Sequence, residues 1–156
     1  MKIELELEPW FKEGIENGDL PAGARIRYVV GDTYLDGGPS EFRIDEPVVF
    51  TLRRLCEGVV DVLNGERFDL SYLFSAHMLH LDPVDDTTVS VWTSSSGPAE
   101  TDIESLVRGV VVTADELVEY VTEVNPAFET ASEIETLRSA SKRLRVEYTD
   151  RFGEIP

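Results

Sequence analysis

The chain has few of the residues on which disulfide-rich and zinc-binding proteins depend. Its 156 residues include one Cys and two His, and Lys occurs only at positions 2, 12 and 142. A single Cys excludes an internal disulfide, and no Cys and His residues stand at the spacing of a structural zinc site. No apolar run approaches the roughly 18 residues that a membrane-spanning helix needs. We therefore expect a protein that uses no disulfide, no structural zinc and no membrane.

The start of the chain lacks the apolar segment of a secretory signal. Residues 3–8 alternate apolar side chains with glutamates, which is the pattern of a half-buried strand. We therefore expect a cytoplasmic location. The length predicts a single domain over residues 1–156.

Acidic residues dominate what is present. The chain has 31 Asp and Glu against 14 Lys and Arg, with a formal net charge of -17 and a pI of about 4.3. Hydrophobic residues make up 42% of the chain, enough to fill a core, so the charge does not imply disorder. Basic residues are mostly Arg, and Val and Thr are frequent. This composition resembles that of proteins from halophilic archaea, and the resemblance implies an acidic surface suited to molar salt.

The distribution of the acid separates two interpretations. Asp and Glu occur in every segment rather than in one block, and scattered acid is more often a solvated surface than a binding face. The alternative is an inhibitor or immunity-type partner of a basic protein that uses the acidic surface near Glu116, Glu119 and Glu123. Nucleic-acid binding is not expected, because no basic stripe interleaved with aromatic residues occurs.

We predict that the stability of the protein rises with salt. Surface charges repel one another over the Debye length, which is ~8 Å at 0.15 M and ~3 Å at 1 M salt. Strong salt therefore removes the self-repulsion of a chain with a net charge of -17. We expect the melting temperature, followed by circular dichroism, to increase from dilute buffer to molar KCl. A melting temperature that stays flat or falls would contradict the interpretation of the acid as a solvated surface.

The apolar periodicity predicts an α+β protein. Strands are expected where apolar and polar residues alternate, at 3–7, 24–30, 42–44, 68–81, 88–93 and 106–112. Helices are expected where apolar residues recur every three or four positions, at 48–63, 113–124 and 126–148, with a loop at 12–23 and a tail at 149–156. The order βββα-βββα-α predicts one antiparallel sheet of about six strands with helices packed on one face. This layout is similar to that of many small α+β proteins, uncharacterised or of the immunity type.

One histidine and two aspartates form a candidate metal site. His80 shares a strand face with Asp82, whereas His77 points to the opposite face. Asp85 stands in the turn that follows. One imidazole and two carboxylates can hold a divalent ion, and such a site would belong to a metal-dependent hydrolase. The commoner interpretation is a sheet histidine beside an acidic turn.

Three aromatic residues are candidate binding contacts. If Val89 and Val91 face the helices, Trp92 lies on the open face of the sheet, where an exposed Trp is a common binding anchor. Trp10 and Phe11 either join Trp92 as contacts or belong to a segment that covers it.

The end of the last helix is the one basic concentration. Arg138 and Arg143 belong to it. These cations either stabilise the helix end through its dipole or dock on an acidic patch of a second copy of the chain, which would make a homodimer.

Two further motifs have ordinary interpretations. Cys56 lies in the apolar face of a helix, where a buried thiol is inert. The segment 94–97 lacks the form of a phosphate-binding loop and is expected to be a connector. No nucleophile–base pair, metal spacing or phosphate loop is visible. We therefore expect a non-catalytic binding or protein-interaction module without a cofactor, whose partner is another protein or a second copy.

Overall fold

The computed structural model describes residues 1–38, 41–42 and 44–154. The first of two four-stranded antiparallel sheets has the order β1-β2-β3, with β6 also paired to β2. Its strands are β1 (Lys2–Glu6), β2 (Ala24–Val30), β3 (Thr33–Leu35) and β6 (Ile44–Glu46). The second sheet, of order β10-β9-β8-β7, contains β7 (Phe68–Ser71), β8 (Met78–Pro83), β9 (Thr88–Thr93) and β10 (Ala99–Asp102). A short pair joins β4 (Gly37–Gly38) to β5 (Glu41–Phe42).

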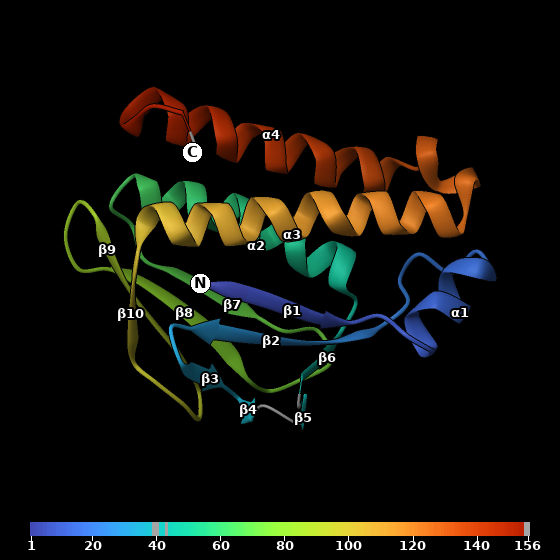
Figure 1. Ribbon diagram of the computed structural model, residues 1–156, viewed down its shortest axis with the longest axis horizontal. Helices are drawn as coiled ribbons and strands as arrows, with labels where there is room; N and C mark the ends of the chain where they lie inside the picture. The colour runs from blue at the N-terminus through green and yellow to red at the C-terminus, as the bar shows by residue number, and fades with distance from the viewer. Residues whose placement is uncertain (39–40, 43, 155–156) are drawn as a thin grey trace.

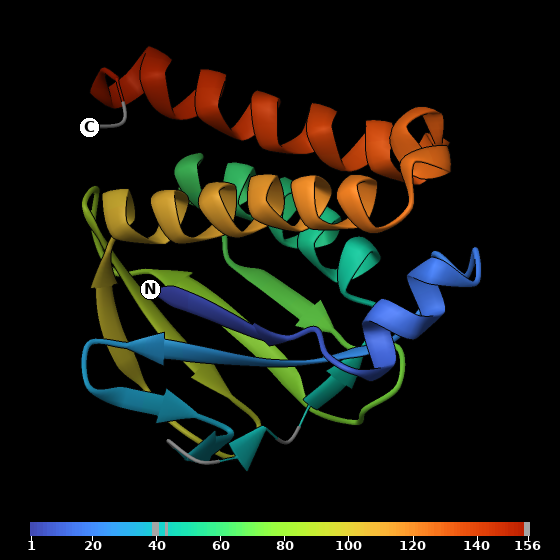
Figure 2. The same ribbon diagram turned by 45° about the vertical axis from the view of Figure 1, so that its right-hand side comes forward.

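The α+β class with antiparallel sheets is confirmed, but the expected single sheet of about six strands is wrong. Figure 2 shows the first sheet in front of the second. Ile26 and Tyr28 of the first sheet and Leu81 and Val91 of the second are fully buried and belong to one apolar cluster. Alternation in the sequence shows that each strand has one buried face. It does not show which sheet a strand joins, because that depends on pairing between distant segments.

Polar side chains connect the two sheets. The hydroxyl of Tyr72 donates to the hydroxyl of Tyr28 at 3.1 Å. The carboxyl of Glu46 accepts two backbone N–H groups from the segment after β7. Asp36 follows β3, is almost fully buried, and accepts a hydrogen bond of 2.7 Å from the Thr93 hydroxyl. These contacts fix the position of one sheet against the other.

The long helices lie on one side of the sheets in two layers (Figures 1 and 2). Helices α2 (Val48–Leu63) and α3 (Ile103–Val124) lie over the sheets, and α4 (Ser132–Phe152) lies above both. The expected apolar stripe of α2 is buried, including Leu52, Leu55 and Val59. Among the described residues no helix is long and apolar enough to cross a membrane.

The expected order βββα-βββα-α is also wrong. Helix α1 (Trp10–Glu16) was not expected, the expected strand at 68–81 is divided between β7 and β8, and α3 begins earlier than expected. Helix α1 lies where a loop was expected at 12–23. The expected strand at 106–112 is the first half of α3. The valines of this segment suggest a strand, but its apolar residues also recur every three or four positions, as in a helix. The helix begins further upstream, after its cap Asp102. Thr113, expected at the helix start, lies within α3 and donates to the Gly109 carbonyl at 2.7 Å.

The last helix is shifted relative to expectation. Residues Pro126–Thr130 form a 3-10 turn, and α4 extends through Phe152. The expected helix at 126–148 therefore starts too early and ends four residues too soon. The last two residues of the expected tail at 149–156 lie outside the described part.

Asp102 is the cap that starts α3, and it makes the stability of the protein depend on pH. Its carboxylate accepts hydrogen bonds of 2.8 Å from the backbone N–H and from the hydroxyl of Ser105. The bond from the Ser105 backbone N–H holds the pKa of Asp102 below its ordinary value. The stabilisation is therefore present above the unfolded pKa of about 3.9 and is lost as the pH falls through the lower folded pKa.

We predict that Asp102→Ala lowers the free energy of unfolding at pH 7 by about 1 kcal/mol, the usual contribution of a helix cap. The difference from wild type should shrink as the pH falls below the unfolded pKa of about 3.9, as the carboxylate of the wild type becomes protonated. Urea unfolding at pH 7 and pH 3 measures both values. Asp102→Asn is the matched control and should stay within a few tenths of a kcal/mol, because Asn caps helices as well as Asp does. An equal loss in both variants would contradict the capping role.

Candidate binding face around Trp92

Trp92 and His80 lie opposite each other on neighbouring strands of the second sheet. Val89 and Val91 are fully buried, so Trp92, between Val91 and the buried Thr93, faces the other side. We call this outer surface of the second sheet the Trp92 face. By strand register it consists of Asp69, Ser71, Met78, His80, Asp82, Thr88, Ser90, Trp92, Glu100 and Asp102.

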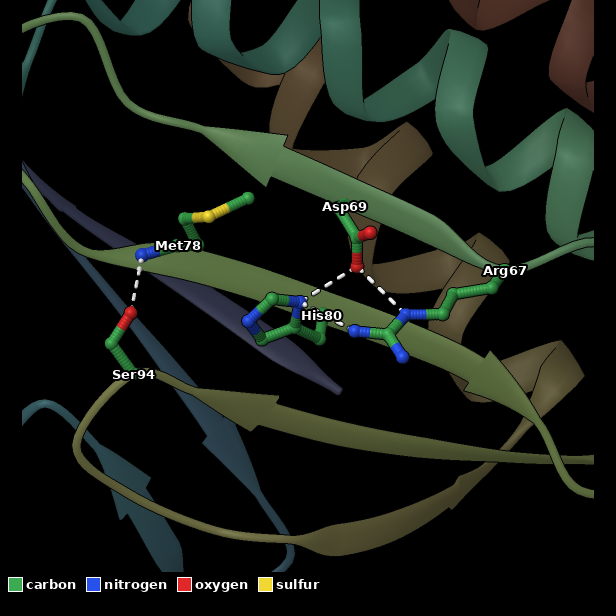
Figure 3. A network of polar contacts seen from close by, with 5 residues as sticks. All are labelled: Arg67, Asp69, Met78, His80 and Ser94. Atoms are coloured by element: carbon green, nitrogen blue, oxygen red, sulfur yellow. Dashed lines mark hydrogen bonds and ion pairs between the residues drawn. The ribbon is translucent and has the colours of Figure 1, made fainter.

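A polar network crosses the Trp92 face from β7 to β8. Nδ1 of His80 lies 2.6 Å from Oδ1 of Asp69, and Nε of Arg67 donates to the same oxygen at 2.9 Å (Figure 3). Arg67 directly precedes β7, and Asp69 is the cross-strand partner of His80. Because a carboxylate only accepts, Nδ1 of His80 carries a hydrogen. The contact of 3.2 Å between Arg67 Nη2 and His80 Nδ1 is therefore proximity between two donors and not a hydrogen bond.

The ring of Trp92 contacts two members of this network. The imidazole of His80 stacks on it with the ring centroids 5.0 Å apart and an interplanar angle of 24°. The guanidinium carbon of Arg67 lies 5.0 Å from the centroid of the Trp92 ring. Trp92 is thus a half-buried platform that holds two nitrogen-containing planar groups.

The charge of Asp69 is stabilised by its neighbours. The hydrogen bond from His80 and then the bond from Arg67 hold the pKa of Asp69 below its ordinary value. Asp69 is therefore ionised at neutral pH. Asp82 and Glu100 lie on the same face, on either side of Ser90, two residues before Trp92 in β9. Among the described residues, Arg67 is the cation that contacts the ring.

The candidate metal ligands are not brought together. His80 pairs with Asp69 rather than with Asp82 or Asp85. Oδ1 of Asp85 accepts the backbone N–H groups of Thr87 and Thr88 at 2.9 and 2.8 Å, so this side chain caps its own turn. Within the described ranges no three His, Cys, Asp or Glu side chains form a group that could hold a metal ion.

The other aromatic candidates separate. Trp10 is 69% exposed at the start of α1, whereas Phe11 is fully buried with its ring centroid 6.3 Å from that of Tyr120. Successive helix residues point about 100° apart, so one faces water and its neighbour faces the core. Phe11 is therefore a core residue that offers no surface contact.

The basic residues of α4 mostly serve the fold. Arg138 pairs with Glu129 at 2.7 Å, and Arg145 pairs with Asp115 at 2.5 Å. Arg151 donates to the carbonyl of Leu63 and to the side chain of Asn64. Arg143 is exposed and makes no ion pair within the described part of the chain. Arg138 and Arg145 are therefore neutralised within the molecule, Arg151 is held by neutral groups, and Arg143 keeps an unpaired charge within the described part of the chain.

The serine-rich connector surrounds a carboxylate of the same chain. The hydroxyls of Thr93, Ser95 and Ser96 all donate to Oδ1 of Asp36. The backbone N–H of Asp36 in turn donates to Ser96 Oγ at 2.9 Å. Segment 94–97 thus has a structural role between the two sheets.

Sequence reasoning missed Arg67, Asp69 and an exposed apolar pair. Leu73 and Phe74, in the segment after β7, are 63% and 65% exposed. Two adjacent large apolar residues in a polar turn were the available signal for them. For Asp69 no local signal exists, because its contact with His80 depends on the register between β7 and β8.

Cys56 lies in the core as expected. It is fully buried, and burial raises the pKa of its thiol to about 12. The thiol is therefore protonated and unreactive at neutral pH.

Comparison with protein families, curated proteins and solved structures finds no match to this chain.

Proposed function

We propose that this chain is a non-catalytic protein-interaction module that binds a basic segment of a partner protein through the Trp92 face. The observation that carries the proposal is the position of Trp92. It lies on a central strand of an open sheet face, in ring contact with His80 and Arg67, and Asp69 lies on the same face across β8. Aromatic side chains at the centre of a polar surface are frequent binding anchors.

The charge of the face supports a basic partner. Asp69, Asp82 and Glu100 present carboxylates on the same side of the sheet as Trp92. Complementary charge speeds association and sets specificity more than it sets affinity. An inhibitor or immunity-type partner of a basic protein is one form of this function. The Trp92 face replaces the acidic surface of α3 as the contact that we propose for it.

The proposal is tested with a defined basic probe. The probe is a seven-residue peptide of alternating Arg and Ser, acetylated and amidated at its ends, so that in an extended chain every Arg points to one side. Binding is measured by fluorescence anisotropy at 0.15 M KCl. We expect Trp92→Ala to weaken binding by up to about fivefold, since a cation over an aromatic ring contributes up to ~1 kcal/mol at exposed sites.

Two controls separate this face from general acidity. Trp10→Ala removes an exposed Trp elsewhere and should leave the affinity unchanged. The pair Asp82→Asn with Glu100→Gln should weaken binding more than the pair Glu119→Gln with Glu123→Gln, which removes the same charge from α3. Equal effects of the two pairs, together with an inert Trp92→Ala, would refute a specific face.

A further inference from the structure

The centre of the Trp92 face is occupied by a guanidinium group of the same chain. Arg67 donates from Nε to Asp69 at 2.9 Å and places its guanidinium carbon 5.0 Å from the Trp92 ring centroid. One aromatic ring and one ionised carboxylate thus hold one planar cation. This is the chemistry by which proteins recognise arginine side chains.

The contacts made by Arg67 select arginine over lysine. A guanidinium is planar and weakly hydrated, so it stacks on a ring while its N–H groups bond to a carboxylate. An ammonium is a compact, strongly hydrated point charge and cannot match both surfaces. A partner segment with arginine would find the ring and the carboxylate already positioned by the register of β7, β8 and β9.

The side chain of Arg67 can be displaced from Trp92 and Asp69 by another arginine. The side chains of Arg67 and Asp69 are 47% and 42% exposed, and an ion pair in water is weak because solvent screens it. Arg67 precedes β7 and its backbone lies outside the strand. Its side chain can therefore leave the ring without disturbing the pairing of the sheet.

We propose that Trp92 and Asp69 form an arginine-binding subsite, filled by Arg67 in the free protein and taken over by an arginine of the basic partner. Arg67 is then an internal competitor that weakens binding until it is displaced. This inference rests on the proposed function, because it names the side chain that the same face recognises.

The experiment compares Arg67→Ala with Arg143→Ala. Both variants remove one exposed positive charge and change the net charge equally, but Arg143 lies on α4, so the 2 M KCl titration and Arg67→Lys separate the local change of potential from the loss of the planar group. Each variant is titrated with the Arg–Ser peptide and with the same peptide carrying Lys for Arg, at 0.15 M and 2 M KCl. Unchanged circular dichroism and melting temperature establish that the variants are folded. Arg67→Lys serves as a second variant that keeps the charge and loses the planar group.

We expect Arg67→Ala to bind the Arg–Ser peptide about two- to fivefold more tightly than Arg143→Ala, the range given by a cation–ring contact at an exposed site. The gain should be smaller for the Lys peptide and absent when Trp92→Ala is added. It should persist in 2 M KCl, where long-range attraction is screened but a contact between ring and guanidinium is not.

The outcomes distinguish the two proposals. If Arg67→Ala and Arg143→Ala bind the Arg–Ser peptide equally while Trp92→Ala weakens it, the proposed face stands and the arginine subsite is wrong. A loss of affinity in Arg67→Ala would also overturn the competitor role and would make Arg67 a direct contact. In the wild type, loss of the Trp92 ring removes the contact of Arg67 in the free protein as well as that of the peptide in the complex, so the ring is tested in the Arg67→Ala background. If Trp92→Ala leaves peptide binding unchanged both in the wild type and in Arg67→Ala, both proposals are wrong.

Discussion

Replacing Glu46 with alanine is expected to lower the free energy of unfolding by about 3 kcal/mol. Glu46 is fully buried, and its carboxyl oxygens accept the backbone N–H groups of Leu73 and Phe74 at 2.9 and 3.0 Å. Removing the acceptor leaves two part-buried donors unpaired, and an unpaired donor that is shielded from water costs about 1–3 kcal/mol. Urea unfolding at constant ionic strength measures the effect.

Two variants test whether this loss comes from the two hydrogen bonds. Glu46→Gln keeps one acceptor oxygen and should lose about half as much as Glu46→Ala, because the amide nitrogen cannot accept. Asp45→Ala changes the exposed neighbouring acid of the same strand and should stay within about 0.5 kcal/mol of wild type. A loss in Glu46→Ala no larger than that in Asp45→Ala would show that the carboxyl does not hold the segment.

Glu46→Ala should also loosen the backbone of the exposed apolar pair, Leu73 and Phe74. With its backbone held by Glu46, the segment after β7 presents Leu73 and Phe74 to solvent in one arrangement. Hydrogen exchange of these two amides should therefore accelerate in Glu46→Ala more than exchange at Leu79 and Leu81 of β8, provided that the variant remains folded.

Gly109→Ala is the second substitution with a large expected effect. Gly109 lies within α3, and a Cβ built on it would stand 1.9 Å from the backbone oxygen of Met1. Helix α3 cannot move away, because Val110 and Val111 beside it are buried. The start of β1 must therefore move instead. We expect a net loss of about 2 kcal/mol, since overpacking costs ~1–3 kcal/mol and more when backbone must shift, less the ~1 kcal/mol gained from alanine in a helix.

Equilibrium unfolding measures the loss of unfolding free energy in Gly109→Ala, and hydrogen exchange shows whether β1 is the strand that loosens. Exchange should accelerate at Ile3 and Leu5 rather than in β8, because the clash acts on the start of β1. Val112→Ala, at a 43% exposed position of the same helix, controls for a change in helix composition and should cost less than about 1 kcal/mol. A Gly109→Ala protein that is more stable than wild type would mean that helix propensity outweighs the contact with Met1.

Much of the secondary structure was predictable from local patterns. The stripe of α2, the alternation in β1 and β2 and the hairpin of β8 and β9 are all recorded in residues close together along the chain. The start of α3 was not predicted, because Leu106 to Val112 suits both a buried strand and a buried helix. The cap at Asp102 decides it, and a single capping residue is a weak signal beside a run of valines.

The candidate site was predicted only in part, because alternation within a strand is visible in the sequence but pairing between strands is not. Alternation within one strand predicts that Trp92 and Val91 point to opposite faces of the sheet. The partner of His80 does not. Asp82 is nearer in sequence, but the pairing of β7 with β8 places Asp69 beside His80. The burial of Phe11 was not predicted either, because the helix that turns Phe11 inward and Trp10 outward was not expected.

The amino-acid sequence by itself determined the balance of charge, the α+β class and the faces of individual strands, because each depends on composition or on neighbours two to four residues apart. Tertiary structure alone decided that the strands form two sheets, that Asp36 and Glu46 join them, and that Arg67 and Asp69 meet at Trp92. These features depend on pairing between segments far apart in the chain, and that pairing is selected by the packing of the whole core rather than by any local preference.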